Sequence, residues 1–222
     1  MSDLAIGTTW LVVLAGAFGA ALVFRAFGLA STYVRDVLHI GAGVWVIGWP
    51  WWHGAAVPIA IVLAVAAAIA CVPTFARRFR FVERFQRCVT SDDEHWGGLV
   101  LYTIAYAIFT VIGVMLDPFA AGAALLALSL GDGVGGAVGR ALGEVHFRAP
   151  GGKQKSLEGS IVVMLGAVAG ALLAAVLFGV PLGCGGALVL GGVAALAEAF
   201  SPRGTDNLLV PAAVYVAAHL VT

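Results

Sequence analysis

Residues 129–160 combine a carboxylate, glycines and cations in an order that could support phosphate chemistry. Asp132 directly follows an apolar run, and an ionisable side chain at the edge of a hydrocarbon layer is costly enough to mark a functional candidate. Its carboxylate could bind Mg²⁺, which takes carboxylate oxygens and completes its shell with phosphate oxygens and water. Arg140, Lys153 and Lys155 follow and could neutralise a polyphosphate. The segment therefore predicts a nucleotide site with Asp132 as a metal ligand.

The glycines of the same segment admit two explanations. At Gly131 and Gly133 the backbone lacks side chains, so exposed amides could cradle a phosphate. Alternatively, glycines four residues apart let membrane helices pack closely, and Gly135 and Gly139 form such a GxxxG pair. The segment is not a Walker A motif, because its Gly-Lys pair is followed by Gln154. This argues against a P-loop kinase and leaves both explanations open.

A second group of polar residues lies near the C-terminus. Glu198 stands near the end of an apolar run, and Asp206 and Asn207 open the last one. Either Asp206 or Asn207 could cap the helix that begins there, but capping does not explain Glu198. We therefore expect Glu198 to share a polar cavity with Asp132 and Asn207.

A third patch, Arg35 and His39, stands at the start of the second apolar run. Two explanations fit Arg35 equally well: a solvated charge that sets the membrane topology, and a contact with substrate. His39 lies deeper in the apolar run. We place both, together with Glu158, among residues that contact substrate or support the site.

The elements that carry these residues are those of a membrane protein. Of the 222 residues 61% are hydrophobic and 11% charged, and the mean hydropathy is +1.02. A soluble domain has about 25% charged residues, so the apolar surplus must face lipid. The formal net charge is zero, which gives no basic excess for a nucleic-acid partner. We expect residues 1–222 to form a single integral membrane domain.

A membrane-crossing helix needs about 20 apolar residues. By that measure the fold class is all-α, a transmembrane bundle of about eight spans, with a Gly-rich, basic loop at 131–156. The expected spans are residues 4–24, 37–52, 55–75, 97–116, 118–130, 157–180, 181–200 and 207–221.

The basic residues fall into alternate connections. All 12 Lys and Arg follow the first, third, fifth or seventh span, and the opposite connections contain none. Because Lys and Arg collect in cytoplasmic loops, this face is predicted to be cytosolic and both termini to lie outside, in a plasma or inner membrane.

Several motifs together resemble one enzyme family. GDGVGGAVGRALG, KSLEGS and AEAF followed by DNLLVP occur in one order, after an RDVLHIGAG opening in which Asp36 stands where Lys is common. This arrangement resembles the CTP-dependent polyprenol kinases, which include phytol kinase, dolichol kinase and yeast-type diacylglycerol kinase. The resemblance extends from Arg35 to Pro211 and depends on order and spacing, because each motif is short.

The resemblance implies transfer of the γ-phosphate of CTP to a long-chain isoprenoid alcohol, such as phytol, geranylgeraniol or a polyprenol, with Mg²⁺ as the required ion. By the same resemblance Asp132 binds metal or acts as base, and Lys155 and Ser156, with Arg140, bind phosphates. Glu198 and Asp206 would serve the metal or the acceptor end. The implied partners are CTP, the lipid alcohol and the surrounding membrane lipid.

Two other classes of function are compatible with these residues. A cytidylyltransferase that forms a CDP-lipid is also a polytopic, Mg²⁺-dependent, CTP-using enzyme, and it would release pyrophosphate where a kinase releases CDP. A small-solute transporter should show paired broken helices in its two halves. The chain has one strong Gly-rich interruption, which lowers the transporter hypothesis without removing it.

Overall fold

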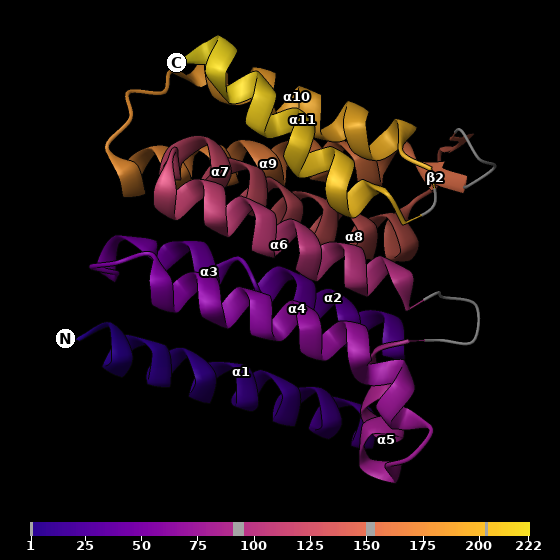
Figure 1. Cartoon of the computed structure of the whole chain (residues 1–222). Coiled ribbons are helices and arrows are strands. Elements are labelled where there is room, and N and C mark those ends of the chain that lie inside the picture. The colour runs from indigo at the N-terminus through magenta and orange to yellow at the C-terminus, as the bar shows by residue number, and fades with distance from the viewer. Residues whose placement is uncertain (1, 91–95, 150–153, 203) are drawn as a thin grey trace.

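The computed structural model describes residues 2–90, 96–149, 154–202 and 204–222. In these residues the chain is all-α apart from one short hairpin, which confirms the all-α part of the predicted fold class. The helices lie roughly side by side, with the N-terminal ones at one edge of the bundle and the C-terminal ones at the other (Figure 1). The main helices are α1 Asp3–Ala26, α2 Ser31–Gly41, α4 Ala56–Ala76, α5 Arg80–Val89, α6 Gly97–Met115, α7 Pro118–Leu126, α8 Gly133–Leu142, α9 Leu157–Phe178, α10 Cys184–Phe200 and α11 Asp206–Val221.

Within the described residues, five helices are long and apolar enough to cross a membrane. They are α1, α4, α6, α9 and the continuous helix of residues 118–142. Helices α10 and α11 are apolar but shorter, with 17 and 16 residues. The prediction of apolar helices of membrane-spanning length is therefore confirmed for five segments.

The second predicted span is broken. In place of one helix over residues 37–52, α2 is followed by a single turn, α3 Val44–Ile47, and a 3₁₀ turn, η1 Trp49–Trp51. Glycines flank α3 on both sides, and they weaken a helix because their backbone is the most costly to order. Trp10 of α1 fills the space at Gly48, where an added Cβ would collide with its indole ring.

The Gly-rich segment is helical where a loop was predicted. Helix α7 continues through a π-helix, η2 Ala127–Asp132, directly into α8, so the expected loop at 131–156 is wrong for residues 131–142. The cause is packing against α9, since a Cβ at Gly135 would lie 2.9 Å from the carbonyl oxygen of Gly159. An antiparallel hairpin follows, with β1 His146–Arg148 paired to β2 Gln154–Ser156.

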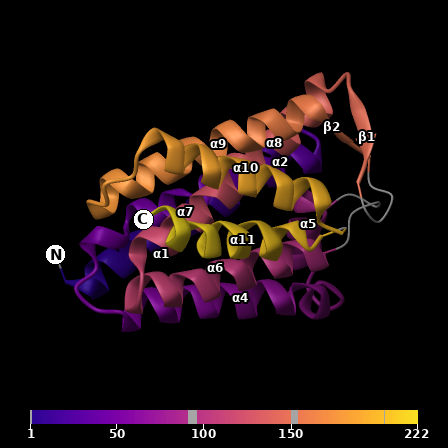
Figure 2. The same cartoon turned by 90° about the horizontal axis from the view of Figure 1, so that it is seen from above.

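The helix ends that carry basic residues lie together at one end of the bundle. The C-terminal end of α1, helix α5 and the hairpin are at this end, and the chain termini are at the opposite end (Figure 1). Figure 2 shows the hairpin extending beyond the neighbouring helix ends. Helix α5 carries Arg80, Arg84 and Arg87 at this end.

Candidate functional site

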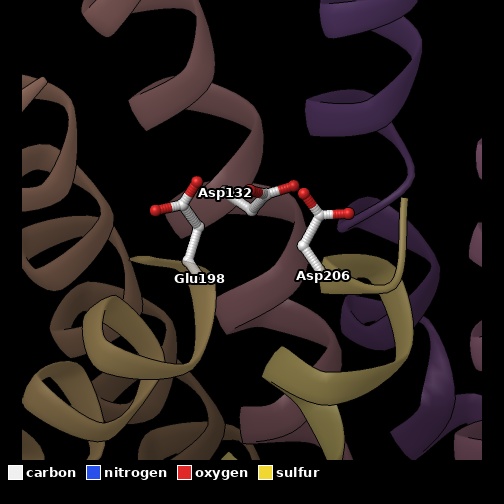
Figure 3. Close-up of side chains that lie close together, drawn as sticks. All are labelled: Asp132, Glu198 and Asp206. Carbon is white, nitrogen blue, oxygen red and sulfur yellow. The ribbon is translucent and has the colours of Figure 1, made fainter. Parts of the chain in front are cut away.

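Three carboxylates from distant parts of the chain meet at this end of the bundle. Asp132 is the last residue of the π-helix, Glu198 lies in the last turn of α10, and Asp206 is the first residue of α11. One oxygen from each lies within 4.8 Å of the others. The close-up in Figure 3 shows the three side chains side by side. Three acidic groups this close repel one another unless a cation offsets their charge. Their oxygens fit a hard divalent cation such as Mg²⁺, with small side-chain movements.

Lys155 supplies one such positive charge. Lys155 lies on strand β2. Its side chain is only 5% exposed, and the side chain of Glu198 is 12% exposed. The ammonium Nζ donates to a carboxylate oxygen of Glu198 and also to the main-chain oxygen of Glu198. That carbonyl is near the C-terminal end of α10, where a helix favours cations. Lys155 thus locks the hairpin to α10 beside the carboxylates.

Arg140 of α8 forms an ion pair with a residue of α2. Its guanidinium donates to the carboxylate of Asp36, which is buried in α2, while the Arg140 side chain remains 38% exposed. The pair ties α8 to α2 and leaves part of the guanidinium accessible. Asp36 was not among the predicted site residues, because an acid next to Arg35 reads as a solvated pair in the sequence.

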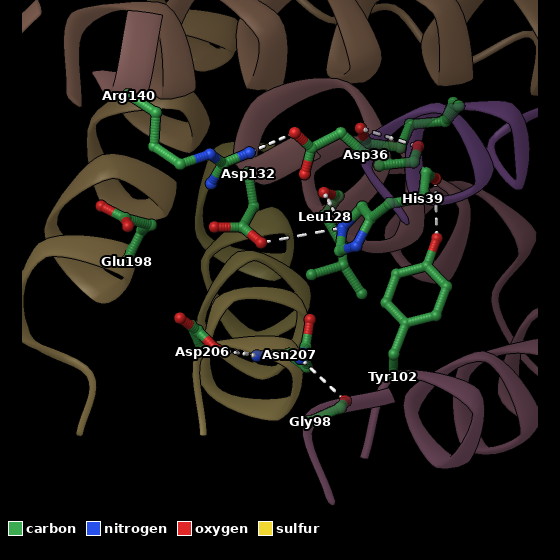
Figure 4. A network of polar contacts seen from close by, with 12 residues as sticks. Asp36, His39, Gly98, Tyr102, Leu128, Asp132, Arg140, Glu198, Asp206 and Asn207 are labelled. Atoms are coloured by element: carbon green, nitrogen blue, oxygen red, sulfur yellow. Dashed lines mark hydrogen bonds and ion pairs between the residues drawn. The ribbon is translucent and has the colours of Figure 1, made fainter. Parts of the chain in front are cut away.

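His39 connects α2 to the π-helix. Its Nε2 lies 3.0 Å from the Leu128 carbonyl oxygen and 3.7 Å from a carboxylate oxygen of Asp132, as Figure 4 shows. Because a carbonyl only accepts, Nε2 carries the proton. Tyr102 donates its hydroxyl to the His39 carbonyl at 2.8 Å, and the two rings lie 4.1 Å apart. Single π-helical turns often occur at functional sites, and here one ends at Asp132.

Asn207 and Asp206 differ in role. The Asn207 amide donates to the Gly98 carbonyl at 3.0 Å, which fixes α11 against α6 (Figure 4). Thr205 is the N-cap of α11, although its hydroxyl donates to the Pro202 carbonyl and does not cap the helix, so the capping expected from Asp206 or Asn207 is wrong. The Asp206 carboxylate instead accepts from the main-chain N–H of Asn207 and is stabilised by the positive end of the helix.

The other predicted phosphate ligands divide into two groups. Ser156 is the N-cap of α9 and accepts from the Gly159 N–H at 3.1 Å, while it also borders the cavity at the site. Gly131 packs against the carbonyl of Val163, away from the cavity, whereas Gly133 faces His39. Since both glycines lie within continuous helix, their amides bond along that helix, and the expected amide cradle is wrong.

Three further predicted residues have different positions. Arg35 borders the cavity. Glu158 accepts from the Val145 N–H at 3.2 Å and closes the base of the hairpin outside the cavity. Lys153 lies outside the described residues.

The site opens into one large cavity of about 1430 Å³. Its polar part is formed by the carboxylates together with Arg140 and Lys155, and its apolar part continues between α1, α2 and α4. A pocket for one drug-sized ligand has about 300–1000 Å³, so this cavity has room for two reactants. Polar and apolar walls in one cavity suit a charged reactant beside a lipid.

Comparison of the chain with models of protein families, with curated proteins and with solved structures finds no match.

Proposed function

We propose that this protein is a membrane lipid-alcohol kinase that transfers the γ-phosphate of CTP to a long-chain isoprenoid alcohol. The observation that carries the proposal is the single cavity, because its charged end suits a polyphosphate and its apolar part suits a hydrocarbon chain. An alcohol at the membrane boundary could place its hydroxyl where the two parts join. Phosphoryl transfer consists mainly of positioning and charge stabilisation, so it requires no covalent intermediate.

The proposed orientation places the site in reach of cytosolic nucleotide. We propose that all eight apolar segments cross the membrane, the broken segment 31–51 and the shorter α10 and α11 included, with both termini outside. The basic helix ends then face the cytosol of a plasma or inner membrane, as the distribution of Lys and Arg favours.

Each side chain has a proposed task. Asp132 and Asp206 would hold Mg²⁺ through one oxygen each, with Glu198 beside them, and the ion supplies charge neutralisation for the phosphates. Arg140 and Lys155 supply fixed positive charge for the same groups. The alcohol oxygen attacks the γ-phosphorus, its proton passes to the second carboxylate oxygen of Asp132, and the bond to the β-phosphate oxygen breaks to release CDP.

A product assay tests the proposal. The protein in nanodiscs is offered γ-labelled or α-labelled CTP or ATP, with phytol, geranylgeraniol, a polyprenol or diacylglycerol as acceptor. We expect the γ-label in a lipid monophosphate and the α-label in CDP, with neither product from Asp132→Asn. When a lipid phosphate replaces the alcohol as acceptor, release of pyrophosphate with the α-label in a CDP-lipid would identify a cytidylyltransferase instead. Absence of any labelled lipid with either nucleotide would overturn the proposal.

A further inference from the structure

The apolar part of the cavity is a slot that runs along α1, the helix at one edge of the bundle (Figure 1). Side chains of α1 border it at Trp10, Leu14, Phe18 and Ala21, and Ile61 and Ile69 border it from α4. The slot is continuous with the carboxylate site, so a chain that lies in it has one end at the reacting groups.

Close packing ends the slot at Trp10. Beyond that residue α1 approaches α4 so tightly that a Cβ at Gly7 would lie 2.9 Å from a methyl carbon of Val57. Trp10 itself lies against the backbone of Gly48 and packs edge-on against Trp45, with ring centroids 5.2 Å apart. Both indoles are buried, so they form a fixed floor.

Ala21 is the last buried residue of α1 along this wall, and the exposed Phe24 borders the cavity beyond it. Ala21 is buried in a cluster with Val34 of α2 and Val89 of α5, near the charged end of the cavity. From Ala21 to Trp10 the helix advances about 16 Å at about 1.5 Å per residue. An extended carbon chain advances about 1.25 Å per bond, so this length holds about 13 chain carbons. That corresponds to about three to four isoprene units, with the hydroxyl beyond Ala21.

We propose that the length of this slot selects the length of the substrate's hydrocarbon chain and that Trp10 sets the upper limit of that length. The protein selects single-chain isoprenoid alcohols of about three to four units, and it discriminates against polyprenols, whose tails would meet the tryptophan floor. Trp10 is a specificity-determining residue. This inference rests on the proposed kinase function for its reaction, but the binding of a lipid chain in the slot can be measured without the reaction.

Three variants test the slot by kcat/KM on geraniol, farnesol, geranylgeraniol and undecaprenol. Trp10→Ala removes the floor of the slot. We expect it to raise the ratio of kcat/KM for undecaprenol to kcat/KM for geranylgeraniol at least about tenfold. Ala17→Phe fills the middle of the slot and is expected to raise the geraniol to geranylgeraniol ratio by a similar factor. The matched control is Leu11→Ala, next to Trp10 but 56% exposed and outside the cavity, which should leave both ratios unchanged.

A second measurement uses the wild-type protein without nucleotide, so it does not depend on the folding of any variant. Geranylgeraniol with a diazirine at its tail is photolysed on the wild-type protein, and the labelled residues are located by mass spectrometry. We expect labels at Trp10 and Ile61. Labels there without phosphorylation of any alcohol would support the slot and overturn the kinase proposal. Phosphorylation with unchanged ratios in Trp10→Ala and Ala17→Phe, and labels confined to lipid-facing residues such as Leu11, would overturn the slot alone.

Discussion

Lys155 allows a sharp test because two explanations of it predict different results. It either contacts the nucleotide phosphates or only neutralises Glu198, to which its ammonium donates. Lys155→Gln removes the charge in both cases, so the single variant does not separate them. A cycle with Glu198→Gln does, since the carboxylate that needs neutralising is then absent.

The stability effect can be worked from the burial of the pair. Removing one partner of a buried ion pair costs about 3–5 kcal/mol, and we take the lower value of about 3 kcal/mol because Glu198 borders the cavity. At about 2–4 °C per kcal/mol for a chain of this size, the apparent Tm of Lys155→Gln should fall by about 6–12 °C. The double variant should recover most of that loss, because a neutral pair leaves no buried charge.

The binding effect separates the two explanations. If Lys155 contacts phosphate, its loss removes a charge-assisted hydrogen bond of about 1.5–3 kcal/mol and weakens CTP binding about ten- to a hundredfold. The Kd for CTP, measured by equilibrium binding in all four proteins of the cycle, should then rise by the same factor in the Glu198→Gln background. Lys155→Arg should not restore it fully, because a planar guanidinium does not replace a compact ammonium. An unchanged Kd on adding Lys155→Gln to Glu198→Gln would refute the phosphate contact.

Four further predictions concern the site, the packing, the orientation and a buried thiol. Asp132→Asn should insert and fold normally yet lose turnover at saturating Mg²⁺, as product assays and thermal unfolding would show; near wild-type turnover would reduce Asp132 to a helix-end residue. Gly135→Ala should lower the unfolding free energy by about 1–3 kcal/mol, because its Cβ would meet α9 backbone, whereas Gly136→Ala, with its nearest atom at 3.4 Å, is the tolerated control. A Cys at position 154 should react with impermeant thiol reagents from the cytosolic face alone, and labelling from the outside alone would overturn the orientation. Burial raises the pKa of the Cys88 thiol, and since the thiolate is the reacting form, its labelling should require higher pH than that of the Cys at 154.

Hydropathy was sufficient to place most helices, because lipid requires long apolar runs. The expected span 4–24 appears as α1 Asp3–Ala26, and 157–180 as α9 Leu157–Phe178. Hydropathy does not report backbone continuity, however, and so it missed the break at α3. It also missed the helix at 131–142, where the glycines form helix because α9 lies against them.

The carboxylate site could be anticipated from the energetic cost of placing acids at the ends of apolar helices. Asp132 and Glu198 are acids at the ends of apolar helices, and both border the cavity together with Asn207 as expected. Asp206, which only the family resemblance had grouped with these acids, completes the cluster. Asp36 and Tyr102 could not be found that way. Asp36 meets Arg140 from 104 positions away, and Tyr102 lies in an ordinary apolar helix, so only the tertiary packing reveals their contacts.

The π-helix that ends at Asp132 holds one residue more than an α-helix would need to join α7 to α8. Deleting any one residue of 127–131 would therefore let the segment relax to α-helix, while the residues after it keep nearly the same direction around the helix axis. A deletion within α8 has no such compensation, and everything after it would turn by about 100°. Arg140 would then leave the cavity and lose its contact with Asp36. A single-residue deletion within 127–131 should therefore be far less damaging than one between Asp132 and Arg140.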